Sequence, residues 1–340
     1  MIYPNVLSTV GETPLIRLNK VTSGLRATVA AKLEMVNPGG SIKDRIAVRL
    51  IEEAEASGQL GPGGTVVEAT SGNTGAGLAM TAAVKGYRAI FVLPDKVSCE
   101  KVALLRAFGA EVVLVPHDSD GTYYDVADRL TRDIPGAYQP NQYFNPTNPE
   151  SHYLSTGPEI WRETEGKITH LVAGAGTGGT ISGIARYLKE QNPDVRIIAA
   201  DPEGSIYSSN PDDLHSSKVE GIGKNFWPGA FDPSLVDEFI QVADCDSLCM
   251  ARRITREEGM LIGGSGGTAV CAALQVARRS NRPETLVVVV LPDGGRSYLS
   301  KVYDDDWMCE NGFPTALEES TRDPIHAYHN GHASVVAAME

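Results

Sequence analysis

Apolar residues in the first half of the chain follow two alternating patterns. Residues 43–56 carry them at helical spacing, with Ile46, Leu50, Ile51 and Ala54 on one face, and the pattern ends at a glycine. Short, almost wholly apolar runs come next, as is typical of parallel strands that helices cover on both faces. We predict strands over residues 65–70, 88–94 and 111–116, separated by helices over residues 73–86 and 100–109.

The same alternation restarts after about residue 150. A polar stretch over residues 203–230 interrupts it, and we expect a surface loop there that lines a site. The whole pattern predicts an α/β fold of two doubly wound, mostly parallel sheets, with a ligand cleft between them at the carboxyl ends of the strands. We predict strands over residues 169–176, 195–201, 238–244 and 285–293, and helices over residues 178–192, 247–259 and 268–280.

Composition narrows the function classes. The chain of 340 residues has a formal net charge of −13. Sequence-independent nucleic-acid binding needs a basic face that displaces counterions, so we expect no nucleic-acid partner. The five cysteines form no CxxC motif and no basic-then-apolar leader opens the sequence, so we expect reduced thiols and a cytoplasmic location. The most apolar strand-like run, TLVVVVL, is too short to span a bilayer, so we expect no membrane partner.

The sequence contains four glycine-rich segments that we interpret as corners at the ends of strands. Backbone N–H groups converge on anions at such corners, and a helix N-terminus adds a favourable field. A tight turn or a capped helix would explain any one of them. Four corners over two sheets favour one cleft that holds a phosphate, a carboxylate and a ring. The corners are TSGNTG at 70–75, GAGTGGT at 174–180, GGSGGT at 263–268 and LPDGG at 291–295.

The segment NPGGSIKDR, residues 37–45, places Lys43 just after a Gly-Gly-Ser corner and at the start of a predicted helix. A broken phosphate loop, an ordinary first-turn lysine and a second phosphate-binding lysine are alternatives. A lysine that forms a Schiff base with a carbonyl cofactor explains the position better, because the other corners already provide a separate phosphate site.

Two polar clusters have simpler explanations than a metal site. His326, His329 and His332 recur at intervals of three, but no carboxylate or cysteine joins them, so we expect no metal. The acidic run in YDDDW, residues 303–307, is expected to be a solvated turn that caps a helix.

The motifs NPGGSIKDR, TSGNTG, GTGGT, EGIG and LPDGG, in this order, resemble those of the pyridoxal-phosphate enzymes of the tryptophan-synthase-β fold (fold type II). The similarity runs from GETPLIRL at residue 11 to WMCENGF at residues 307–313. Within that family the chain is similar to the cysteine synthase and cystathionine β-synthase group. DPEGS, EGIGKNFWP and LPDGGRSYLSKVYDDDWM resemble the cystathionine β-synthase catalytic core most.

The resemblance implies a role for each matching residue. Lys43 would form the Schiff base with pyridoxal 5′-phosphate, Asn73 would bond the ring hydroxyl oxygen, and Ser265 would face the ring nitrogen. Asp293 would also belong to the cofactor site. The cofactor phosphate would lie on Gly176, Thr177, Gly178, Gly179 and Thr180. The substrate would contact Thr70, Ser71, Thr74 and Gln142 through its α-carboxylate, Gly221 near its amine, and Lys224 at its distal end.

The resemblance also implies an organisation into lobes. Residues 44–148 would form a smaller mobile lobe that grips the substrate carboxylate. Residues 1–43 and 149–313 would form a larger lobe that binds the cofactor phosphate. Residues 314–340 would be a tail without a regulatory domain, and no segment precedes residue 1 that could bind haem, so haem is not expected. Relatives are usually dimers, which implies a homodimer.

The implied activity is β-replacement on L-serine or an activated serine. Lys43 would act as general base at Cα, and a neutral Ser265 would favour β-elimination over transamination. The expected reaction condenses serine with homocysteine through an aminoacrylate to give cystathionine. Alternatives are cysteine synthesis from O-acetylserine or O-phosphoserine and sulfide, a secondary-metabolism β-replacement with another nucleophile, and a catalytically silent binding protein. A nicotinamide dehydrogenase is disfavoured because no acidic residue follows a G-x-G-x-x-G turn.

Overall fold

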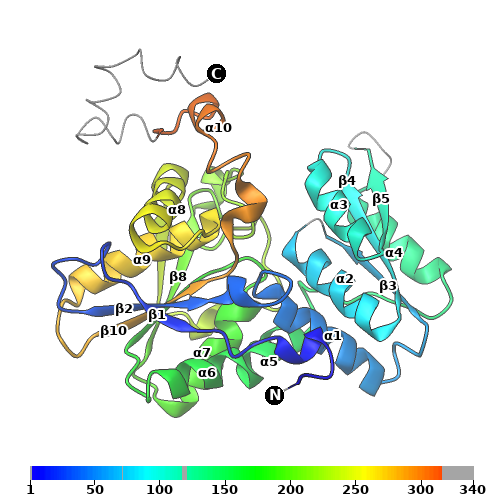
Figure 1. Cartoon of the computed structure of the whole chain (residues 1–340), viewed down its shortest axis with the longest axis horizontal. Coiled ribbons are helices and arrows are strands. Elements are labelled where there is room, and N and C mark those ends of the chain that lie inside the picture. The colour runs from blue at the N-terminus through cyan, green and yellow to red at the C-terminus, as the bar shows by residue number, and fades with distance from the viewer. Residues whose placement is uncertain (1, 71, 117–120, 316–340) are drawn as a thin grey trace.

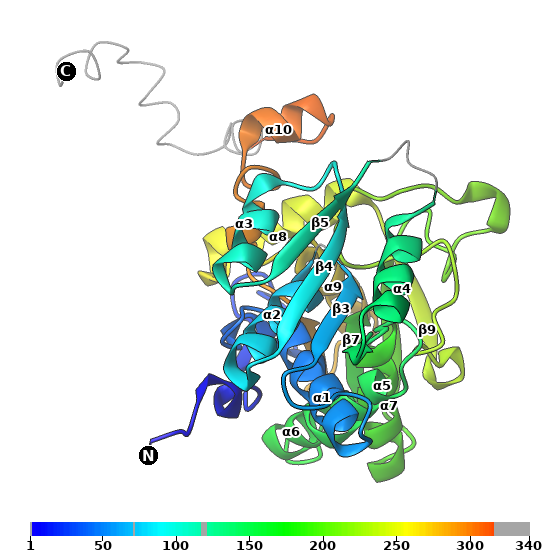
Figure 2. The ribbon, with the colours of Figure 1, turned by 90° about the vertical axis from the view of Figure 1, so that its right-hand side faces the viewer.

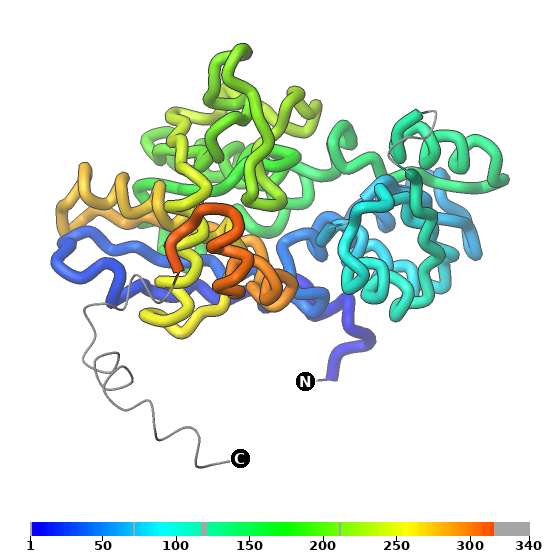
Figure 3. The backbone as a smooth tube through the Cα atoms, turned by 90° about the horizontal axis from the view of Figure 1, so that it is seen from above, coloured from blue at the N-terminus to red at the C-terminus, as the bar shows by residue number. Residues whose placement is uncertain are grey.

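The computed structural model describes residues 2–70, 72–116 and 121–315. Two sheets lie side by side, each with its own helices (Figure 1). All pairs in the two sheets are parallel except β1 with β2, so the prediction of two mostly parallel sheets is confirmed. The chain starts in the larger sheet, builds the smaller sheet, and then returns to the larger one (Figure 3).

The larger sheet has six strands in the order β1-β2-β10-β7-β8-β9. Its central strand, β10, comes from the sequence TLVVVVL, which is apolar throughout because helices cover both faces of the sheet. The strands are β1 Leu15–Arg17, β2 Thr28–Leu33, β7 His170–Gly174, β8 Arg196–Pro202, β9 Glu238–Val242 and β10 Leu286–Leu291.

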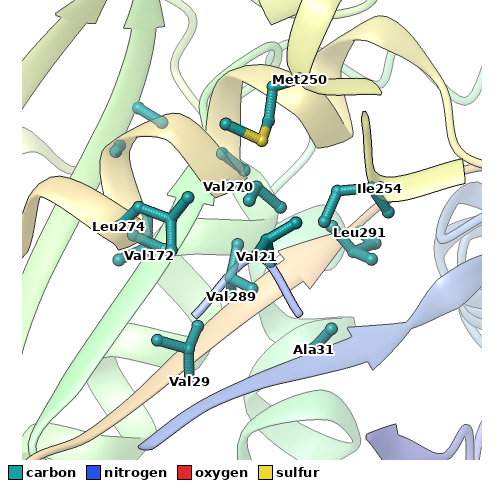
Figure 4. Packing of buried hydrophobic residues seen from close by; sticks show 14 of the residues in the cluster. Val21, Val29, Ala31, Val172, Met250, Ile254, Val270, Leu274, Val289 and Leu291 are labelled. Carbon is teal, nitrogen blue, oxygen red and sulfur yellow. The ribbon is translucent and has the colours of Figure 1, made fainter. Parts of the chain in front are cut away.

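The alternation of side chains along β10 divides the core of this lobe into two layers. Val287 and Val289 pack on one side with helices α8 (Asp244–Glu258) and α9 (Gly264–Arg279). Val288 and Val290 pack on the other side with α7 (Gly179–Gln191). Figure 4 shows the first layer, in which strand side chains meet those of the helices, including Val29, Val172, Val289, Met250, Ile254, Val270 and Leu274.

The smaller sheet has four parallel strands in the order β5-β4-β3-β6. Figure 2 shows β5, β4 and β3 of this sheet side by side. On one face, Ile51 of helix α1 packs against Val66 and Phe91 of the sheet. On the other face, Ala127 of helix α4 packs with Val67 and Val92. The strands are β3 Thr65–Ala69, β4 Arg88–Pro94, β5 Glu111–Val115 and β6 Ala137–Tyr138, and the helices are α1 Lys43–Ala56, α2 Asn73–Lys85, α3 Cys99–Ala107 and α4 Tyr123–Asp133.

Several elements were not predicted. β2 contains Lys32, a charge in the middle of an apolar run, and the structure buries it against Glu159 and Glu163 at 3.0 and 2.8 Å. Helices α5 (Thr147–Leu154) and α6 (Thr156–Glu163) each contain a proline, which obscures their periodicity. The remaining elements are short: η1 Val6–Thr9, η2 Glu34–Val36, η3 Pro211–Asp213, η4 Pro233–Leu235, η5 Gly295–Tyr298 and α10 Asp305–Glu310.

The smaller polar clusters can also be located. Asp304 caps α10 by accepting a hydrogen bond of 2.8 Å from the backbone N–H of Trp307, which confirms the predicted cap. The five cysteines are all free thiols. Within the described residues, no helix is both long and apolar enough to cross a bilayer, and no three acidic, histidine or cysteine side chains group to hold a metal. His326, His329 and His332 lie outside the described residues.

Candidate functional site

A cavity of about 330 Å³ lies between the two sheets, and all four glycine-rich corners line it. Strands β3, β7 and β10 end at this cavity, because the carboxyl ends of parallel strands share one edge of a sheet. The N-termini of α1, α2, α7 and α9 also open onto it. The lining includes Lys43, Thr70, Asn73, Thr74, Gln142, Gly176, Thr177, Gly178, Thr180, Gly221, Lys224, Ser265 and Asp293.

Lys43 is the first residue of α1. The preceding residue, Ile42, is buried and donates its backbone N–H to the carbonyl of Pro292 at 2.8 Å, which ties this helix start to the end of β10. Burial lowers the pKa of Lys43 from 10.5 to about 8; the charge of Asp293 opposes this shift and that of Lys224 adds to it. A substantial fraction of this amine is therefore neutral near physiological pH, as a nucleophile or base requires.

A buried ionic network fixes the first turn of α1. Arg45, two residues after Lys43, pairs with Glu34 at 2.7 Å and with Glu159 at 2.7 Å. Lys32 also pairs with Glu159 at 3.0 Å, so this one carboxylate joins β2, α1 and α6. Breaking such a network leaves an uncompensated buried charge, so it holds Lys43 in place firmly. The sequence analysis did not identify Arg45, although it lies inside the NPGGSIKDR motif.

The loop between β7 and α7 lines the cavity on the side of the larger sheet. Gly178 has a φ of +79°, and a Cβ there would lie 2.2 Å from Cβ of Phe231, so only glycine fits. Thr177 and Thr180 line the cavity at the N-terminus of α7. Backbone N–H groups, two hydroxyls and the helix dipole together suit a phosphate.

The corresponding corner of the smaller lobe lies between β3 and α2. Thr74 donates a hydrogen bond of 2.6 Å to Oε1 of Gln142, and both side chains are buried. Thr70 is buried beside them, while Ser71 lies outside the described residues. Hydroxyl groups and an amide at a helix start suit a carboxylate.

Asn73 and Asp293 meet across the cleft. Oδ2 of Asp293 accepts hydrogen bonds from Nδ2 of Asn73 at 2.8 Å and from the hydroxyl of Tyr298 at 2.6 Å. Burial raises the pKa of Asp293, and these two hydrogen bonds oppose that shift. Tyr298 was missed by the sequence analysis; its signal is its position shortly after the LPDGG corner.

Ser265 lies on the larger lobe at the second position of α9. Its side chain is buried and lines the cavity. Gly263, the N-cap of α9, donates its backbone N–H to the carbonyl of Asp293 at 3.2 Å, which joins this corner to the LPDGG corner. Ser265 itself therefore contributes a neutral hydroxyl to the lining, beside the carboxylate of Asp293.

The EGIG segment forms the rim of the cavity. Gly223 donates its backbone N–H to the carbonyl of Ala175 at 2.9 Å, which attaches the segment to the β7–α7 loop. Lys224 donates a hydrogen bond of 3.1 Å to the hydroxyl of Tyr143, and burial lowers the pKa of Lys224. Gly221 lines the same rim.

Glu220, which the sequence analysis missed, lies next to Gly221. It pairs with Lys101 of α3 at 2.6 Å and with Lys301 at 2.5 Å. One carboxylate thus bridges the smaller lobe and the C-terminal part of the larger lobe. Only the tertiary structure brings these three residues together, because they are 119 and 81 positions apart in the chain.

Comparison with known proteins agrees with this fold. Residues 6–293 match the family model described as "Pyridoxal-phosphate dependent enzyme". The chain therefore belongs to the family of pyridoxal-phosphate dependent enzymes, which confirms the resemblance seen in its motifs.

Curated relatives carry the name "Cystathionine beta-synthase". The protein from Apis mellifera is 48% identical over 321 residues, which cover 92% of this chain and 64% of the relative. The one from Mus musculus is 47% identical over 323 residues, covering 92% and 57%. The one from Saccharomyces cerevisiae is 47% identical over 327 residues, covering 90% and 64%. This chain thus spans about three-fifths of the length of these relatives.

Two solved structures are similar over their full length. An O-ureido-L-serine synthase has a TM-score of 0.84 and 36% identity, and the match covers 91% of this chain and 100% of that one. A hydrogen sulfide-producing enzyme from Fusobacterium nucleatum has a TM-score of 0.83 and 36% identity, with 88% and 100% covered.

The residues of the cavity fit pyridoxal phosphate. Its aldehyde needs an amine that is partly neutral, and Lys43 has a pKa of about 8. Its phosphate needs converging N–H and hydroxyl donors, which the β7–α7 loop supplies. Its ring needs a cavity with polar groups at the edge, and Asn73 at the start of α2 and Ser265 at the start of α9 both line this one.

Proposed function

We propose that this chain catalyses β-replacement on L-serine or an activated serine with pyridoxal phosphate, and that it condenses the amino acid with homocysteine to give cystathionine. The observation that carries the proposal is the meeting of Lys43, with its lowered pKa, and the anion-binding corners of both lobes in one cavity. The names of the curated relatives support the same reaction.

The chemistry follows from the groups in the cavity. Pyridoxal phosphate, when bound, supplies a carbonyl that condenses with an amino group and a ring that withdraws electrons from the α-carbon. Lys43 then removes the proton from Cα and later returns it to the same atom. The Cβ–O bond of serine breaks, a Cβ–S bond to the thiol forms, and water is released. Ser265 adds no negative charge near the ring, which disfavours transamination.

The substrate is held by the smaller lobe. Thr70, Ser71, Thr74 and Gln142 would bind its α-carboxylate, and the hydrogen bond between Thr74 and Gln142 supports this assignment by joining two of these side chains. Gly221 would lie near the amine. We propose that residues 44–148 move as this smaller lobe, toward residues 1–43 and 149–313, when a carboxylate binds.

Lys224 would bind the anionic end of the second substrate. Its only side-chain hydrogen bond to a described residue goes to a neutral phenol, Tyr143, and its pKa is lowered by burial. The neighbouring carboxylate, Glu220, is already paired with Lys101 and Lys301. A partly buried cation that pairs with no carboxylate of the described residues favours an anionic ligand, such as the carboxylate of homocysteine or the phosphate of O-phosphoserine.

A second reaction of the same class has its own support. One similar solved structure is that of a hydrogen sulfide-producing enzyme, and another is that of an O-ureido-L-serine synthase. Sulfide with O-acetylserine or O-phosphoserine would give cysteine in the same cavity. We further propose a homodimer, which the resemblance in the motifs implies, and a cytoplasmic location, which the five free thiols support.

The deciding experiment tests donors and nucleophiles separately. Purified protein loaded with pyridoxal phosphate is incubated with serine, O-acetylserine or O-phosphoserine, each with homocysteine or sulfide, and products are identified by mass. Cystathionine from serine is the expected product, and Lys43→Ala should abolish its formation. Cysteine as the dominant product would favour the second reaction, and no product from any pair would overturn the proposal.

A further inference from the structure

Helix α5 lies directly behind the β7–α7 loop and places two polar side chains against it. Asn148 and His152 are four residues apart, so they lie on the same face of the helix. Asn148 contacts Thr177, and His152 contacts Thr180. Asn148 and His152 are buried, and neither lines the cavity, whereas both threonines do.

The contact of Asn148 has a fixed direction. Nδ2 donates one hydrogen bond of 2.8 Å to the carbonyl of Gln142, which can only accept, so the orientation of the amide is settled. Its second hydrogen bond of 3.0 Å goes to Oγ1 of Thr177. The backbone N–H of Gly179 also donates to Oγ1, at 3.4 Å. Oγ1 of Thr177 therefore accepts two hydrogen bonds, from Asn148 and Gly179, and its own hydroxyl proton remains available for a group in the cavity.

The contact of His152 has two alternatives. Nε2 lies 3.1 Å from Oγ1 of Thr180, and Nδ1 lies 2.9 Å from Oγ1 of Thr156. Burial and the charges of Lys43 and Arg45 hold the pKa of His152 well below 6.5, so one ring nitrogen donates and the other accepts. Thr156 suits either tautomer, because a hydroxyl both donates and accepts.

Only one tautomer suits an anion in the cavity. If Nε2 carries the proton, it donates to Thr180, and the Thr180 hydroxyl can donate to a phosphate oxygen. If Nδ1 carries the proton, Thr180 donates to His152 and turns lone pairs toward the phosphate, which is repulsive. Close packing of the helices keeps the ring at this distance, since a Cβ on Gly183 of α7 would lie 2.8 Å from Cβ of His152.

We propose that Asn148 and His152 are positioning residues for the cofactor phosphate, each donating a hydrogen bond to a threonine so that Thr177 and Thr180 both donate to the phosphate. The proposal rests on the assignment of the phosphate to residues 176–180 made above. It adds that His152 must be the Nε2–H tautomer when the cofactor is bound.

The tautomer can be measured without any assay of turnover. Protein with ¹⁵N-labelled histidine is loaded with pyridoxal phosphate, and the ring nitrogen shifts of His152 are assigned by comparison with His152→Gln. The expected result is a neutral ring protonated at Nε2. A neutral ring protonated at Nδ1 in the loaded protein would overturn the proposal.

The affinities of non-reactive analogues test how much His152 contributes to phosphate binding. Pyridoxine 5′-phosphate and pyridoxine carry an alcohol in place of the aldehyde, so their affinities for cofactor-free protein do not depend on a bond to Lys43. His152→Leu removes the neutral hydrogen bond that orients the Thr180 hydroxyl, so it should weaken the phosphate ester by about threefold to tenfold and leave pyridoxine unchanged. His152→Gln, which keeps a donor amide, should retain most of the affinity.

Two controls keep this test decisive. His170→Leu removes another histidine that contacts a threonine, Thr169, at the opposite end of β7, and should change neither affinity. In a Thr180→Val background, His152→Leu should have little further effect. An equal loss for both analogues, or an undiminished loss in the Thr180→Val background, would overturn the proposal. Wild-type protein that does not prefer the phosphate ester would overturn the phosphate assignment itself.

Discussion

The β7–α7 and β3–α2 corners of the cavity differ in how tightly the protein surrounds them. In the larger lobe, the β7–α7 corner is enclosed: Gly178 touches Phe231, and the carbonyl of Gly176 accepts a hydrogen bond of 2.8 Å from the hydroxyl of Tyr207. In the smaller lobe, the β3–α2 corner is open at Gly72, where a Cβ would meet no atom of the described residues within 4 Å.

This difference matches two kinds of ligand. A resident cofactor needs donors that are fixed before it binds, because fixed donors lose little entropy on binding. A substrate that enters and leaves in every cycle needs a corner that can approach and withdraw. The enclosed corner therefore suits the phosphate, and the open corner suits the substrate carboxylate.

Matched glycine substitutions in the two corners should show the largest difference, in the free energy of unfolding. Gly178→Ala forces a positive φ on alanine and a clash with Phe231, so it should lower the free energy of unfolding by ~2–5 kcal/mol. Gly72→Ala, in open space at a φ of −110°, should change it by less than ~0.5 kcal/mol. Urea unfolding of cofactor-free protein measures both. Equal losses would show that the two corners are equally enclosed.

The pH dependence of cofactor uptake tests Lys43, which lies between the two corners. Only the neutral amine attacks an aldehyde, and its pKa is lowered to about 8, so the neutral fraction rises with pH and levels off above about 8. Uptake of pyridoxal phosphate by cofactor-free protein should therefore speed up by ~50-fold between pH 6 and 8. Pyridoxine 5′-phosphate cannot react with the amine, so the pH dependence of its binding measures the contribution of titratable groups other than Lys43. A rise that continues to pH 10 would show an ordinary lysine.

Removing one threonine hydroxyl from each corner should separate cofactor from substrate. Thr177→Val should weaken binding of pyridoxal phosphate by ~10-fold or more, with little change in KM for serine in the saturated enzyme. Thr74→Val should raise KM for serine by a similar factor and leave cofactor affinity unchanged. Cofactor titration and steady-state kinetics give the two values. The opposite pattern would exchange the roles of the corners.

The smallest expected effect concerns the rim. Lys224→Met should raise KM for homocysteine by ~10-fold through loss of a charge contact, and should not affect 2-mercaptoethanol, a thiol without a carboxylate. Lys218→Met, an exposed lysine of the same loop, is the matched control. If KM for serine or the turnover of O-phosphoserine changes instead, Lys224 contacts the amino-acid donor rather than the thiol.

Much of the fold could be predicted from local patterns. The helical spacing of Ile46, Leu50 and Ile51 predicted both α1 and its buried face, and all three side chains are fully buried. The β2 strand was missed because Lys32 interrupts its apolar run, and only its ionic partners, distant in the sequence, make its burial tolerable. Helices α5 and α6 were missed because prolines at their first turns obscured the periodicity.

The site likewise has features that could be predicted from the sequence and features that could not. Glycine-rich corners and a lysine at a helix start depend on backbone conformation and residue type, which are local properties, so Lys43 and the four corners could be identified from the sequence by itself. Their meeting in one cavity follows from parallel strands, whose carboxyl ends share an edge. Three further contacts of the site depend on the tertiary structure. They are the ion pairs of Glu220 with Lys101 and Lys301, the hydrogen bond of Lys224 to Tyr143, and the packing of α5 against the β7–α7 loop. These contacts join residues far apart in the chain, and their hydrogen bonds and desolvation depend on distances that no local pattern encodes.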